Sequence, residues 1–181
     1  MTTLLRWAGR CQPRQAHRVS RWALILALAC TVGLVACADP SRVTLGTPAA
    51  DVLHSVGAPT GRYALSGGGE RLQYSSQPSG QTVVNVDVNA AGQVVRVEQA
   101  LNEGLFGQRI QPNTWTRADV LREYGSPAQV IQVHNFVGHI WVWRYLYGPT
   151  WRLLYIDIGP DGVVRGWSNG DENMPDPPDP R

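Results

Sequence analysis

The chain has 181 residues, with 16 basic residues, all of them arginine, against 14 acidic residues, and a formal net charge of +2. Five arginines and no acidic residue precede Cys37, so the part from Cys37 onward carries 11 basic and 14 acidic residues and a net charge of 11 minus 14, or −3. A mildly acidic domain is a poor electrostatic match for a phosphate backbone, so this balance gives no support to nucleic-acid binding.

Residues 1–36 have the pattern of an export signal. The arginines are followed by a charge-free apolar run from Trp22 to Ala36, which leads directly into Cys37. A charged arm, a short apolar core and a small-residue cleavage site are typical of a segment that is removed during export. Counted on to Ala38, the run from Trp22 has 17 residues, which is only the lower limit of about 17 for a membrane-spanning helix, so an uncleaved anchor is a second interpretation and simple secretion a third.

The tetrapeptide Leu34-Val35-Ala36-Cys37 resembles the bacterial lipobox. This resemblance implies that Cys37 receives fatty acyl chains such as palmitate and becomes the first residue of the mature protein. Cys11 and Cys30 lie in the segment that would be removed, so the mature chain could form no intramolecular disulfide. Acyl chains stabilise membrane attachment by about 0.8 kcal/mol per buried methylene, and membrane lipid is therefore the first expected partner.

Two parts of the mature chain share one pattern of residues. Asp51-Val52-Leu53 recurs as Asp119-Val120-Leu121, and the same order of glycine, proline, aspartate and glycine follows each of them. These later pairs are Gly57 and Gly125, Pro59 and Pro127, Asp87 and Asp157, and Gly92 and Gly162. The offset is 68 for the first part of the pattern and 70 for the second, which indicates a tandem repeat.

Each copy predicts a short helix followed by an antiparallel meander. Thr47-Pro48 predicts one helix start, and Thr116 with Asp119 resembles a capping box at the other. Alternating β-branched residues predict strands over 71–75, 82–88 and 94–99, and over 129–134, 139–146, 152–158 and 163–167. The fold class is therefore α+β, with two tandem units of a short helix packed on three to four strands.

The expected domains follow from this division. They are a signal peptide at 1–36, a tether at 37–43, a first repeat at 44–106, a second repeat at 107–169, and a tail at 170–181. The tail is rich in proline and aspartate and is expected to be disordered.

The combination of a lipobox cysteine, helix, Gly-x-Pro and meander resembles the SmpA/OmlA family of BamE-like outer-membrane lipoproteins, whose fold is related to the β-lactamase inhibitor protein scaffold. The motifs that carry the resemblance are the paired residues above together with Tyr74 and Tyr145. The resemblance implies a periplasm-facing scaffold that contacts the barrel-assembly machinery. Ala38 after the cysteine resembles the sorting pattern for the outer membrane, although the chain departs from the family in having two units.

The sequence offers no evident catalytic or metal-binding constellation. His54, His134 and His139 are too scattered for a metal site, and no nucleophile lies beside a base. We therefore expect no enzyme activity, no metal and no cofactor, and keep an envelope hydrolase only as a remote third hypothesis.

Aromatic residues supply the best candidate for binding a protein partner. Trp141, Trp143, Tyr145 and Tyr147 alternate and so share one strand face. The candidate partner-binding residues are Trp141, Trp143, Arg144, Tyr145, Tyr147, Trp151 and Arg152. Because large aromatics also dominate cores, core packing and an exposed binding patch remain alternatives. The leading function is a lipid-anchored scaffold for outer-membrane barrel assembly or envelope integrity, and the alternative is an inhibitor-like or ligand-binding module with a concave aromatic sheet face.

Overall fold

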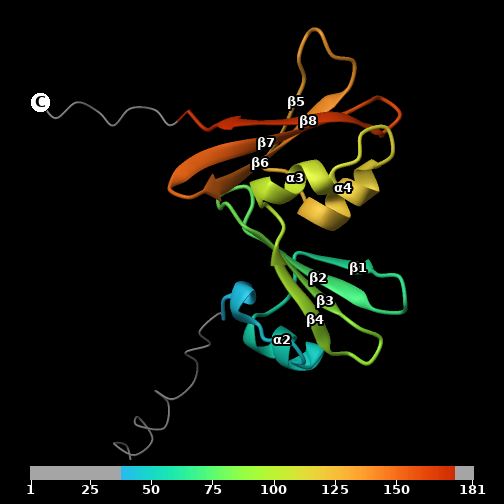
Figure 1. Ribbon diagram of the computed structural model, residues 1–181, viewed down its shortest axis with the longest axis vertical. Helices are drawn as coiled ribbons and strands as arrows, with labels where there is room; N and C mark the ends of the chain where they lie inside the picture. The colour runs from blue at the N-terminus through green and yellow to red at the C-terminus, as the bar shows by residue number, and fades with distance from the viewer. Residues whose placement is uncertain (1–37, 174–181) are drawn as a thin grey trace, which may run out of the picture. The chain divides into compact units, whose positions relative to one another are not determined.

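The computed structural model describes residues 38–173, and the expected lipid-attachment residue Cys37 lies outside this part. The described chain is α+β, with two four-stranded antiparallel sheets of strand order β1-β2-β3-β4 and β5-β6-β7-β8 (Figure 1). We call residues 38–99 the first unit and residues 100–173 the second unit. None of the helices in the described chain has the length and apolar character required to cross a membrane.

The first unit begins with a short 3-10 helix, η1 (Pro40–Arg42), followed by α2 (Ala49–Ser55) and the first sheet. Its strands are β1 (Gly61–Ala64), β2 (Glu70–Ser75), β3 (Val83–Val88) and β4 (Val94–Gln99). Alternation along β2 and β3 sends one set of side chains toward α2. The buried core on that side consists of Val52, Leu72, Tyr74, Val84, Val86, Val88 and Val94.

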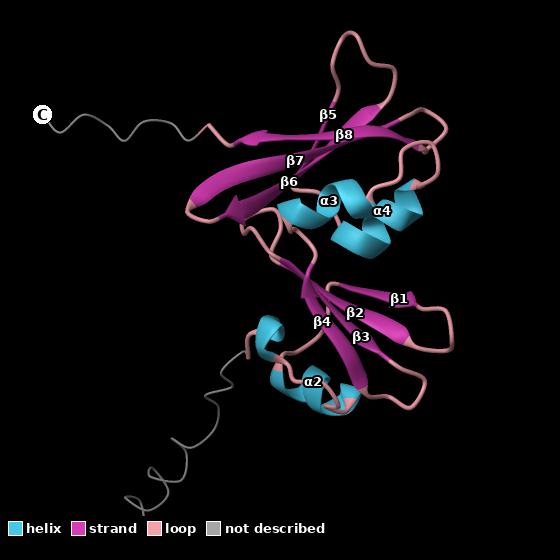
Figure 2. Ribbon diagram, in the orientation of Figure 1, coloured by secondary structure: helices cyan, strands magenta, loops and turns pink. Residues whose placement is uncertain are grey.

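The second unit has two helices on one face of its sheet (Figure 2). These are α3 (Glu103–Arg109) and α4 (Arg117–Tyr124), and the strands are β5 (Gln129–Ile131), β6 (His139–Tyr147), β7 (Thr150–Ile158) and β8 (Val164–Asp171). Phe106 of α3 is fully buried, and its ring meets those of Tyr124 and Tyr145 edge-on at centroid distances of 6.0 and 5.3 Å. Aromatic packing of this kind fills the space between helices and sheet.

The elements differ from the predicted ones at several places. Neither β1 nor α3 was expected, and the predicted boundary between residues 106 and 107 falls inside α3, which packs into the core of the second unit. The predicted tether contains η1, and Val43 packs on the first core. The predicted disordered tail starts too early, because β8 continues to Asp171. Residues 174–181 lie outside the described chain.

The two units use equivalent hydrogen bonds where each helix starts. The Ala49 amide donates to the Gly92 carbonyl at 2.9 Å, and the Arg117 amide donates to the Gly162 carbonyl at 2.9 Å. Isolated bridges join Pro48 to Gln93 and Thr116 to Val163. The capping contact predicted at the second helix is present, since the Asp119 carboxylate accepts from the Thr116 amide at 2.8 Å. The first helix starts one residue later than predicted, with Pro48 at the N-cap.

A polar layer, buried at Arg71, Gln73, Asn85 and Asp87 and partly exposed at its edges, joins the two units. It lies on the face of the first sheet opposite α2 and consists of Arg71, Gln73, Asn85, Asp87, Arg96 and Glu98, with Arg109 and Glu123 from the second unit. Arg71 donates to Asp87 at 2.7 Å and to Glu123 at 2.6 Å. Arg109 pairs with Glu123 at 2.7 Å and also with Glu98. Three arginines thus balance three carboxylates.

The same layer caps the C-terminus of α4. Gln73 donates to the Arg122 carbonyl at 3.2 Å, Asn85 donates to the Glu123 carbonyl at 2.9 Å, and Arg71 donates to the Arg122 carbonyl at 3.1 Å. The last four carbonyls of a helix have no partner within the helix, so these bonds satisfy groups that would otherwise be buried without one.

The charges in this layer stabilise one another. Burial alone would raise the pKa of Asp87, but hydrogen bonds and positive charge from Arg71 and Arg96 more than offset it and hold the pKa below its ordinary value. Burial alone would lower the pKa of Arg71. Its hydrogen bonds and ion pairs with Asp87 and Glu123 more than offset this effect, so the pKa of Arg71 lies above its ordinary value. Asp87 and Arg71 therefore face each other as an ion pair at neutral pH.

We expect Arg71→Met to destabilise the protein by about 3–5 kcal/mol, because it leaves two buried carboxylates without their cation. Arg62→Met is the matched control, since Arg62 pairs with Glu70 at 3.5 Å on the surface and such pairs contribute about 1 kcal/mol or less. Urea unfolding followed by circular dichroism measures both. Equal losses in the two variants would contradict a central role for the polar layer.

A second pair of variants tests the core of the second unit. The Tyr145 hydroxyl donates to Glu103 at 2.5 Å and accepts from Arg152 at 3.1 Å, whereas the buried Tyr124 hydroxyl has no partner in the described chain. Tyr145→Phe should cost about 1–3 kcal/mol, and Tyr124→Phe should leave stability unchanged or raise it. Thermal unfolding of the two variants gives the comparison, and a larger loss for Tyr124→Phe would contradict it.

Candidate functional site

The predicted aromatic face of β6 lies against the helices of the second unit. Trp143 and Tyr145 are 0 % exposed and belong to the core under α3 and α4, and Trp141 packs against the same core. The sequence correctly placed these rings on one face, but their interpretation as an exposed binding patch is wrong for Trp143 and Tyr145. Helix α3, which the sequence did not predict, covers Tyr145 through Phe106.

The other predicted binding residues do not form one patch. Arg144 lies on the opposite face of β6, where its guanidinium stacks 5.1 Å from the ring centroid of Trp151 and its Nε donates to Glu172 at 2.8 Å. Arg152 lies on the helix side and pairs with Glu103 at 3.0 Å. Tyr147 is exposed at the end of β6. The structure therefore separates these residues between two faces and a strand end.

The face of the second sheet opposite α3 and α4, which we call the outer face, is the better candidate. Paired residues in an antiparallel sheet point to the same side. The register pairs Ile140 with Asp157, Val142 with Tyr155, Arg144 with Leu153, and Leu146 with Trp151. No helix of residues 38–173 covers this side (Figure 2). The outer face is therefore an apolar surface with few charges.

A cavity of about 390 Å³ opens on the outer face. It is lined by Pro78, Ala128, Gln129, Val142, Arg144, Leu153 and Glu172. Pro78 of the first unit lines one wall, and the neighbouring Gln77 fixes it there, because the Gln77 side-chain amide group donates to the Arg144 carbonyl at 2.7 Å and accepts from the Arg144 amide at 3.3 Å. These bonds continue the ladder beyond the end of β5, so the first unit helps to shape the cavity.

Asp157 is the unusual group on the outer face. It is half-buried beside Ile140 and Gly166 in the strand register, and it makes no side-chain hydrogen bond or ion pair with any residue from 38 to 173. Burial raises the pKa of Asp157 above its ordinary value. Asp87, which the sequence pattern pairs with it, instead binds Arg71 and Arg96. The sequence signalled Asp157 only as a repeated motif residue.

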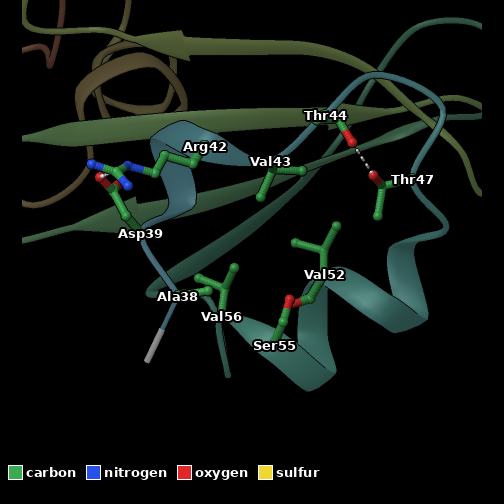
Figure 3. Close-up of a pocket in the computed structure, with 9 residues that line it drawn as sticks. All are labelled: Ala38, Asp39, Arg42, Val43, Thr44, Thr47, Val52, Ser55 and Val56. Carbon is green, nitrogen blue, oxygen red and sulfur yellow. Dashed lines mark hydrogen bonds and ion pairs between the residues drawn. The ribbon is translucent and has the colours of Figure 1, made fainter. Parts of the chain in front are cut away.

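A larger cavity, of about 560 Å³, lies in the first unit beside the first described residue (Figure 3). Its lining includes Ala38, Val43, Val52 and Val56, and its only charged residues, Asp39 and Arg42, pair with each other at 3.7 Å. Both are exposed, and the Thr44 and Thr47 hydroxyls in the lining share a hydrogen bond of 3.0 Å. Across residues 38–173, no three histidine, cysteine or acidic side chains are close enough to hold a metal ion.

No protein-family model and no curated protein sequence matches this chain. A structural match is the crystal structure of a DUF4309 family protein, YjgB, from Bacillus subtilis subsp. subtilis str. 168. It covers 68 % of this chain and 77 % of its own, at 17 % sequence identity and a TM-score of 0.28. A similarity at this level indicates nothing about activity.

The two aspartates should respond in opposite ways to substitution. Asp87→Asn should lower the melting temperature at neutral pH by several degrees, whereas Asp157→Asn should leave it unchanged or raise it, because the raised pKa of Asp157 makes its ionisation unfavourable in the fold. The stability from Asp87 is present above the ordinary pKa of 3.8 and is lost as pH falls through the lower folded value. The penalty from Asp157 develops as pH rises through 3.8 toward its higher folded pKa.

Thermal unfolding between pH 3 and pH 7 measures both effects. A drop in melting temperature for Asp157→Asn as large as that for Asp87→Asn would show that Asp157 has a stabilising partner.

Proposed function

We propose that this protein is a lipid-anchored binding protein, held at the outer membrane and facing the periplasm, and that its outer face holds a protein partner. The observation that carries the proposal is the outer face itself, where the partly exposed Ile140, Leu153 and Tyr155 lie beside the buried Val142 with no helix of the described chain over them. Exposed apolar patches of this kind mark interaction sites.

The start of the described chain supports the anchoring part of the proposal. The Ala38 amide, one residue beyond Cys37, donates to the Ser55 carbonyl at 3.1 Å. If Cys37 is acylated, the first unit therefore begins one residue from the lipid, with no free linker between them. Such a protein would hold its first unit close to the membrane surface.

We also propose that the two units arose by tandem duplication, and their shared backbone features support this. Equivalent amides pair at both helix starts, and both sheets have a β-bulge at the recurring aspartate, Asp87 in one and Asp157 in the other. In the first unit the face opposite α2 is covered by α4. In the second unit the equivalent face is open, which is where a partner would take the place of α4.

The role that the resemblance to BamE-like lipoproteins suggests is assistance to outer-membrane barrel assembly. The alternative, an inhibitor-like or ligand-binding module, is favoured by the cavity of about 390 Å³ with Arg144 and Glu172 in its lining. The aromatic face cannot serve this alternative, because Trp143 and Tyr145 are buried. Either function is binding rather than catalysis.

The test is photocrosslinking in native membranes. A benzophenone amino acid at Leu146, which is 47 % exposed on the outer face, should capture barrel-assembly components, and the same group at Val95, 53 % exposed on the first sheet, should not. Mass spectrometry of the extracted protein should show an acylated chain beginning at Cys37. An intact, unmodified chain, or equal capture at both positions, would contradict the proposal.

A further inference from the structure

We propose that the outer face selects a partner segment that carries an arginine or a lysine among apolar residues, and that this cation pairs with the Asp157 carboxylate. The inference rests on the proposed function, because it assumes that the outer face binds protein, and it adds the chemistry of what is bound.

The first step compares two carboxylates in the same backbone setting. Asp87 sits beside a β-bulge with Arg71 opposite it on β2 and Arg96 opposite it on β4. Both arginines bind it, at 2.7 and 2.9 Å. At the second bulge, Asp157 has Ile140 and Gly166 in those two register positions. The second unit keeps the carboxylate and lacks both cations.

The second step concerns the charges that could neutralise Asp157 from within the described chain. Arg144 is the arginine on the outer face, and it is engaged by Glu172 at 2.8 Å and by the ring of Trp151. Arg165 pairs with Asp161 at 2.6 Å at the β7–β8 turn. No ion pair from residues 38–173 reaches Asp157. The carboxylate is therefore available to a cation from outside.

The third step concerns space. A Cβ added at Gly166 would lie 3.5 Å from the Asp157 Oδ2, which is ordinary van der Waals contact. Because the glycine has no side chain, the position that Arg96 occupies beside Asp87 is empty beside Asp157. A guanidinium or ammonium group entering from a partner can reach the carboxylate there.

The fourth step decides the kind of partner. The partly exposed Ile140, Leu153 and Tyr155 favour apolar side chains of a partner. Burying the carboxylate under those side chains is costly unless a cation accompanies them. Arginine is enriched at the centres of protein interfaces and forms paired hydrogen bonds with carboxylates. An anionic ligand, such as a phosphate group or nucleic acid, would be repelled. The face thus fits an apolar peptide segment with one cation.

The experiment uses phage-displayed random peptides of about 12 residues as the probe, selected on the full chain purified in detergent. Affinities of the enriched peptides are then measured for the wild type, Asp157→Asn, Gly166→Arg and the control Asp161→Asn. Gly166→Arg keeps the carboxylate but supplies a cation from the chain itself. We expect enriched peptides with an arginine or lysine among apolar residues, and at least tenfold weaker binding to Asp157→Asn and to Gly166→Arg, with Asp161→Asn unchanged.

Circular dichroism confirms that each variant is folded. Enriched peptides without a cation, or binding that both variants retain, would overturn the cation proposal while leaving the binding function in place. Failure to enrich any peptide that depends on Asp157 would overturn it as well. Sedimentation that shows a dimer dispersed by Gly166→Arg would make a second copy the occupant and overturn the choice of a separate partner. If the crosslinker at Leu146 captured no barrel-assembly component in membranes, by contrast, the proposed function itself would be contradicted.

Discussion

The cap that the first sheet provides for the C-terminus of α4 is the interaction on which the rest of the structure depends. Gln73, Asn85 and Arg71 donate to the carbonyls of Arg122 and Glu123. A helix end carries partial negative charge, so a buried guanidinium beside it is favourable as well as hydrogen-bonded. Gly125 allows this approach, because it has a φ of 69° and a Cβ there would lie 2.7 Å from Gln73 Oε1. Once α4 is held in this way, the aromatic side of the second sheet is covered and its opposite side is left open.

The two units differ in the side chains that lie on the sheet face opposite their helices. The face of the first sheet opposite α2 is polar because it packs on the C-terminus of α4, whose carbonyl groups require hydrogen-bond donors. The outer face of the second sheet has Ile140, Val142 and Tyr155 at the corresponding positions. The aliphatic side chains of Ile140 and Val142 cannot donate hydrogen bonds to the carbonyl groups of a helix end. Its partner must therefore bring side chains rather than an uncapped helix end. The lone Asp157 is the group that still requires a polar complement.

Local sequence patterns predicted the α+β class, most strands, the contact between Thr116 and Asp119, and the two faces of β6. They could not predict α3, because Glu103–Arg109 is a single short segment with two glycines, which disfavour helix, and its stability comes from burying Phe106. They could not distinguish the polar layer from a solvated face, since alternation of Gln73 with Leu72 and Tyr74 fits both. For the same reason the aromatic residues were assigned to a face without knowing what covers it. Periodicity gives the faces of a strand, but only tertiary packing decides which face remains free.

On an apolar surface with one carboxylate, different groups determine the affinity and the selectivity of binding. The apolar residues stabilise the complex with any partner that excludes water, by roughly 25 cal/mol per Å² of buried apolar surface, and they discriminate little between partners. The carboxylate of Asp157 adds little to a partner that lacks a cation and costs that complex the desolvation of a charge. Its main effect is therefore to reject partners that are merely apolar, so the selectivity of the outer face comes from the one group that apolar partners cannot satisfy.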